Sequence, residues 1–94
     1  MTMRITEKML EQLAARINSA TNSPATSYTR TAEGRMRANV GNYHISYAYG
    51  GACLHRMSST GGGVCTPLGA GHVTKRELRE QMHAYLAGLE AKQA

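Results

Sequence analysis

The chain has 94 residues, 41% of them hydrophobic, which suits one domain with a thin core and leaves a homo-oligomer open. Its aromatic surface comes from five Tyr, because Trp and Phe are absent. Eleven Lys and Arg against six Asp and Glu give a net charge of +5, which favours polyanionic partners such as nucleic acid. No segment approaches the roughly 18 apolar residues of a membrane span, and no signal peptide is visible. We therefore expect a cytoplasmic protein without a membrane partner, with Cys53 and Cys65 as reduced thiols.

The first predicted element is a helix over about residues 6–19. Thr6 is a favourable N-cap, and Glu7 suits the positive end of the helix dipole. Apolar residues recur at helical spacing and form one stripe, made of Met9, Leu10, Leu13, Ala14 and Ile17. This stripe predicts the face that packs on the core.

The next segment, about residues 20–41, is rich in Ser, Thr, Asn and Gly. Such side chains compete for backbone hydrogen bonds and favour turns, so we expect an irregular loop. Met36, Ala38 and Val40 alternate with polar residues, which leaves room for a short strand. Three arginines make the loop basic: Arg30, Arg35 and Arg37. It is either a solvated connector or an arm that contacts phosphates.

A β meander is predicted over about residues 42–68. Apolar and polar side chains alternate from residue 43 to 49, and Gly50-Gly51 fits the two-residue turn of a hairpin. That turn predicts the pairs Tyr49–Ala52, Tyr47–Leu54 and Ile45–Arg56 on one face, and Ala48–Cys53, Ser46–His55 and His44–Met57 on the other. Val64, Thr66 and Leu68 then predict a short third strand, which Pro67 confines to an edge.

The last predicted element is a helix over about residues 74–90. Thr74 and Glu77 have the spacing of a capping box. The apolar stripe consists of Leu78, Met82, Tyr85, Leu86 and Leu89. Residues 1–94 therefore predict a single α+β domain in the order α-β-β-β-α, with a three-stranded antiparallel meander and both helices packed on one face.

Several short motifs lie between Gly41 and Leu89: GNYHISYAYGG, GGG, and GHVTKREL followed by a helix with LAGL. Together they resemble a group of small accessory proteins of tailed phages and prophages. The resemblance implies a non-enzymatic viral protein in the host cell cytoplasm that binds and inhibits a host defence component. Some proteins of this group are anti-CRISPR proteins, which occupy guide-RNA complexes. The resemblance therefore implies a host protein–RNA or protein–DNA complex as the partner.

Three alternatives to that function remain open. One is a sponge that sequesters a nucleotide second messenger, and another is a small DNA-binding regulator, although no helix-turn-helix is visible. The third is a phage assembly protein. The first two would contact a nucleotide or nucleic acid directly.

The start of the second helix carries two cations, Lys75 and Arg76, where acidic residues are favoured. Because a helix N-terminus binds anions, they predict an anion or partner site together with Thr74. Four arginines would add contacts to phosphates or an acidic partner: Arg30, Arg35, Arg37 and Arg56. Alternatively, both cations point to solvent, at a cost of a few tenths of a kcal/mol.

The tyrosines on one strand face, Tyr43, Tyr47 and Tyr49, are candidates for base stacking. In a chain without Trp and Phe they equally suit the core.

A zinc site is the remaining alternative, because two cysteines and two histidines are a known ligand set: Cys53, His55, Cys65 and His72. They lack the C-x-x-C spacing of a strong zinc motif, so we expect no metal and no other cofactor. Cys53 near His44 or His55 is the best candidate nucleophile, and the acidic residues lie almost wholly in the helices. We therefore expect no enzymatic activity.

Overall fold

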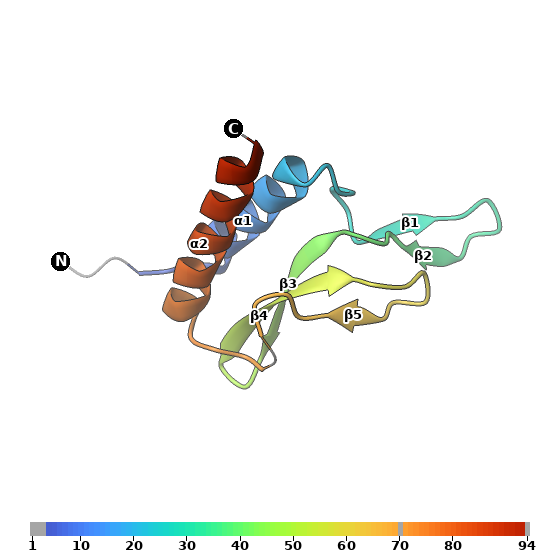
Figure 1. Ribbon diagram of the computed structural model, residues 1–94. Coiled ribbons are helices and arrows are strands. Elements are labelled where there is room, and N and C mark those ends of the chain that lie inside the picture. Colours follow the sequence, from blue (N-terminus) through green and yellow to red (C-terminus); the bar gives the residue numbers. More distant parts are fainter. Residues whose placement is uncertain (1–3, 70, 94) are drawn as a thin grey trace.

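The computed structural model describes residues 4–69 and 71–93 and confirms an α+β fold (Figure 1). The elements in chain order are α1 (Glu7–Ala20), β1 (Tyr28–Arg30), β2 (Met36–Ala38), β3 (Tyr43–Ala48), β4 (Gly51–Met57), β5 (Val64–Cys65) and α2 (Lys75–Gln93). β1 and β2 form a two-stranded antiparallel sheet, and β3, β4 and β5 form a three-stranded one in that order. The second sheet corresponds to the predicted meander.

The core lies between the two helices and one face of the β3–β4 hairpin. Leu10 and Ile17 of α1 and Met82 of α2 are fully buried there against Leu54 of β4. Burying an aliphatic side chain of this size contributes roughly 1.5–3 kcal/mol, so the helices hold the sheet through these stripes. Figure 1 shows both helices together at one end, as predicted, with β1 and β2 projecting from the other end.

Both helices begin at the predicted caps. The Thr6 hydroxyl accepts a hydrogen bond from the Met9 N–H at 3.2 Å. At α2 the Thr74 hydroxyl accepts from the Glu77 N–H at 3.1 Å, and it lies 3.2 Å from a Glu77 carboxylate oxygen. Each cap satisfies an N–H group that the helix itself leaves without an acceptor. α2 ends three residues beyond the predicted boundary of 90, at Gln93.

The turn between β3 and β4 differs from the prediction. It is formed by Tyr49 and Gly50, which both have positive φ, 54° and 75°, as a type I′ turn requires. The observed pairs are Tyr43–Arg56, His44–His55, Ile45–Leu54, Ser46–Cys53, Tyr47–Ala52 and Ala48–Gly51. The predicted register was therefore wrong by two residues. An even shift keeps every side chain on its predicted face.

Gly51 has a different role from the one predicted. A Cβ atom there would lie 2.6 Å from the Val73 carbonyl oxygen, so Gly51 permits a close backbone approach. Val73 exchanges two backbone hydrogen bonds with Ala52, at 2.8 and 3.0 Å. The predicted third strand is also shorter than expected, because β5 contains only Val64 and Cys65.

The segment predicted as an irregular loop contains the β1–β2 hairpin, which we call the arm (residues 28–38). Its turn is closed by the Gly34 N–H, which donates to the Thr31 carbonyl at 2.9 Å, and by the Thr31 N–H, which donates to the Arg35 carbonyl at 2.7 Å. Gly34 has a φ of 82°, so the turn matches the three-residue hairpin with a glycine bulge. Only the short strand allowed near Met36 was anticipated.

Two asparagines that follow the arm bond to residues before and within β1. The Asn39 amide donates to the Thr26 carbonyl at 2.9 Å, and its oxygen accepts from the Thr29 hydroxyl at 3.0 Å. The buried Asn42 amide donates to the Pro24 carbonyl at 2.8 Å and accepts from the Ser27 hydroxyl at 2.9 Å. The polar residues that predicted a loop thus supply the bonds that position the arm.

Candidate nucleic-acid interface

The arm carries three exposed arginines, Arg30, Arg35 and Arg37, against one acidic residue, Glu33. Arg37 pairs with Thr29 across the ladder, whereas Arg30 pairs with Met36. Because side chains alternate between the faces of a strand, Arg30 and Arg37 lie on opposite faces. The arm therefore presents guanidinium groups on both of its faces.

Apolar side chains accompany these cations. Met36 is 58% exposed and lies on the same face as Arg30 and Tyr28, which is itself 46% exposed. A hollow of about 350 Å³ borders the base of the arm and is lined in part by Thr29, Arg37 and Thr60. Mixed cationic and apolar surface on a projecting ribbon is typical of a partner-binding region.

Arg56, a fourth predicted contact residue, packs against a tyrosine of the larger sheet. Its guanidinium carbon lies 5.8 Å from the ring centroid of Tyr43, in a cation–π contact. Tyr43 is buried, and its hydroxyl lies 2.8 Å from that of Tyr85. Burial and the Tyr85 hydroxyl raise the pKa of Tyr43 to about 12.

The three tyrosines proposed for base stacking do not form one surface. Tyr43 is buried under the helices, and Tyr47, on the same sheet face, donates its hydroxyl to the Glu7 carbonyl at 3.4 Å. Burial and the carboxylates of Glu11 and Glu7 raise the pKa of Tyr47 to about 12. Tyr49 is 98% exposed at the tip of the hairpin. Of the three, Tyr49 alone presents its whole ring to solvent.

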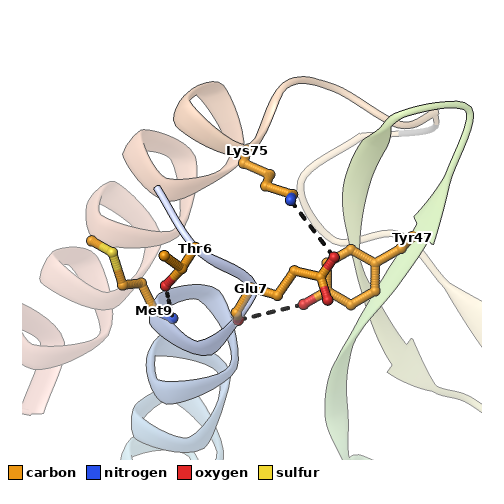
Figure 2. Close-up of polar contacts among 5 residues, drawn as sticks. All are labelled: Thr6, Glu7, Met9, Tyr47 and Lys75. Carbon is orange, nitrogen blue, oxygen red and sulfur yellow. Dashed lines mark hydrogen bonds and ion pairs between the residues drawn. The ribbon is translucent and has the colours of Figure 1, made fainter. Parts of the chain in front are cut away.

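Lys75 has a partner inside the fold. Its ammonium nitrogen lies 3.6 Å from a Glu7 carboxylate oxygen, so it links the starts of the two helices (Figure 2). An exposed pair of this kind contributes about 0.2–1 kcal/mol. This contact gives Lys75 a partner within the fold, and its contact with an external anion stays a prediction. Arg76 is exposed at the next position.

The sheet face away from the helices carries four aromatic rings in succession, which we call the ring row: Tyr49, His72, His55 and His44. The distances between neighbouring ring centroids are 6.0, 6.3 and 5.6 Å in that order. The Ser46 hydroxyl lies 3.1 Å from His72 Nε2 and orients that ring. Burial, reinforced by a neighbouring histidine in each case, lowers the pKa of His44 and of His55.

The candidate zinc ligands do not converge. Cys53 is buried, and its thiol lies 3.7 Å from the Leu54 carbonyl oxygen, whereas Cys65 is exposed. His55 and His72 contact each other within the ring row. Across residues 4–69 and 71–93, no three His, Cys, Asp or Glu side chains are close enough to hold a metal ion. Burial raises the pKa of the Cys53 thiol, which disfavours the nucleophilic thiolate.

The lowered pKa values of His44 and His55 predict an acid-sensitive fold. As the pH falls, both histidines bind protons near the ordinary pKa of 6.5 in the unfolded chain, and only at a lower pH in the folded protein. The free energy of unfolding should therefore be highest above that pH and fall as pH drops below it. Urea unfolding between about pH 7.5 and 5 measures the slope.

Substitution of both rings provides the control for this pH dependence. The double variant His44→Gln with His55→Gln should flatten the slope, whereas His83→Gln, on the exposed surface of α2, should keep it. A double variant that retains the full wild-type slope would assign the acid sensitivity to other groups.

No family model, curated protein or solved structure matches the chain. Neither of the helices in the described part of the chain is long and apolar enough to cross a membrane. The chain's own residues must therefore carry any functional proposal.

Proposed function

We propose that this chain is a non-catalytic nucleic-acid-binding protein whose arm contacts phosphates. The observation that carries the proposal is the projection of Arg30, Arg35 and Arg37 on a two-stranded ribbon, away from the helices. A ribbon of this width enters a nucleic-acid groove or lies along a strand. Guanidinium groups bind phosphate oxygens through paired hydrogen bonds.

For the setting we propose the one that the motifs between Gly41 and Leu89 imply, that of a phage accessory protein. In that setting the target is a host defence component built around nucleic acid, such as a CRISPR effector complex, which the protein inhibits by occupying it. The nucleotide sponge has less support, because Lys75, a main residue of its supposed site, pairs with Glu7 at 3.6 Å.

Salt dependence tests the proposal. Binding of a labelled oligonucleotide, followed by fluorescence anisotropy, should weaken steeply with salt, because bound arginines displace counterions from the phosphates. In the triple variant Arg30→Gln, Arg35→Gln, Arg37→Gln, the slope of log affinity against log salt should fall by about one per arginine.

A variant with the same loss of charge serves as the control. Lys8→Gln, Arg16→Gln and Lys92→Gln remove three exposed cations from the two helices instead of the arm. This control should retain most of the wild-type affinity and slope. Equal losses in the two variants would mean that net charge and not the arm governs binding, and an affinity that is flat with salt would exclude phosphate contacts.

A further inference from the structure

Tyr49 occupies a position that its backbone disfavours. Its φ of 54° lies in the left-handed region, where Gly and Asn are favoured and a bulky aromatic residue is costly. The ring is also 98% exposed, so it adds nothing to the core in return. Its one ring contact among the described residues is with His72, at a centroid distance of 6.0 Å. A costly, exposed ring indicates a role outside folding.

The ring row leads from this turn to the base of the arm. At its far end, His44 Nδ1 lies 3.2 Å from the Asn42 side-chain oxygen, which also accepts from the Ser27 hydroxyl. Ser27 immediately precedes β1. Asn42 thus connects the far end of the ring row to the residue that precedes β1, so the ring row ends beside the base of the arm.

We propose that the ring row is a stacking surface for the bases of a single-stranded nucleic acid whose phosphates continue onto the arm. The inference rests on the proposed function and specifies its ligand. Neighbouring rings are tilted by 65–80°, so an edge-to-face contact between two rings covers a face of only one of them. Aromatic side chains on an open sheet bind single strands in this way.

A duplex does not fit the same surface. Its bases are paired and stacked inside the helix, so they cannot reach rings on a sheet unless the duplex opens. The arginines of the arm contact phosphates, which both forms share. The two parts of the surface therefore have separable roles, in which the arm supplies charge and the ring row selects unpaired bases.

The test compares a labelled single-stranded DNA, the single-stranded RNA of the same sequence and the matching DNA duplex by anisotropy at one fixed salt concentration. The wild-type protein should bind a single strand more tightly than the duplex, and the two single strands show whether the sugar matters. Tyr49→Asn should weaken single-strand binding by roughly five- to a hundred-fold, as the loss of one stack predicts. Its binding to the duplex should not change.

Tyr49→Asn is a safe probe because Asn favours positive φ, so its melting temperature should equal or exceed that of the wild type. Tyr49→Phe keeps the ring and should keep the affinity. Tighter binding to duplex, or wild-type single-strand affinity in Tyr49→Asn, would overturn the inference while leaving the arm's function intact. Binding of none of the three nucleic acids would overturn the proposed function and this inference together.

Discussion

Replacing Asn18 with Leu should lower the free energy of unfolding by about 2–4 kcal/mol, the largest loss that we expect from a polar side chain. Asn18 lies in α1 and is buried, with 4% of its surface exposed. Its amide donates to the Tyr43 carbonyl at 3.0 Å, and its oxygen accepts from the Tyr43 N–H at 2.7 Å. Leu has a similar branched shape but no polar atom, so both backbone groups at the start of β3 would lose their partner.

Chemical unfolding in urea measures this effect. Gln12→Leu is the matched control, because it also exchanges an amide for Leu on α1 but at an exposed position, and it should stay within about 0.5 kcal/mol of wild type. If Asn18→Leu were as mild as Gln12→Leu, water would be replacing the amide and the bond between α1 and β3 would be dispensable.

The two helices could be predicted because their signals are local. Thr6 and Thr74 each precede an apolar stripe at helical spacing, and each caps its helix through an N–H three residues later. The faces of the β3–β4 hairpin could be predicted for the same reason, since alternation depends on neighbouring residues alone. The packing of both helices on one face follows from these stripes.

The features that sequence reasoning missed depend on distant contacts. The hairpin register depends on whether Gly50-Gly51 or Tyr49-Gly50 forms the turn, and the close approach of Val73 to Gly51 is invisible in the local pattern. Likewise, Asn42 reads as a turn residue, but it binds Pro24 and Ser27 and so holds the arm. A polar segment was predicted to be a loop because the sequence does not show which distant groups its side chains bond to.

The candidate site likewise combines features that local sequence predicts with features that depend on distant contacts. The basic character of residues 30–37 was evident from composition, whereas the hairpin that presents them was not. The ring row was hidden because the predicted register opposed His44 to Met57, although the observed register opposes it to His55. His72 comes from the segment before α2, and only the fold brings it to the sheet. Together with the alternation that begins at Met36, the Gly34 turn was a local signal that could have revealed the arm.

Gly51→Ala should destabilise the fold by about 1–3 kcal/mol, because the new methyl group meets backbone that cannot yield easily. The atoms nearest to the added Cβ, the Val73 oxygen at 2.6 Å and the Val73 carbonyl carbon at 3.2 Å, both belong to the main chain. Displacing Val73 would stretch its two hydrogen bonds to Ala52 and move Thr74, the cap of α2, which follows directly. The destabilisation would thus extend from the first residue of β4 to the start of α2.

The same substitution at Gly88 should have the opposite sign. Gly88 lies within α2, and a Cβ atom there meets nothing within 4 Å, so Ala should stabilise the helix by about 0.5–1 kcal/mol. The urea midpoint should therefore be lowest for Gly51→Ala and highest for Gly88→Ala, with the wild type between them. A Gly51→Ala midpoint at or above that of wild type would show that glycine is needed there neither for space nor for the bridge to Val73. The β3–β4 turn would then hold α2 less firmly than its contacts indicate.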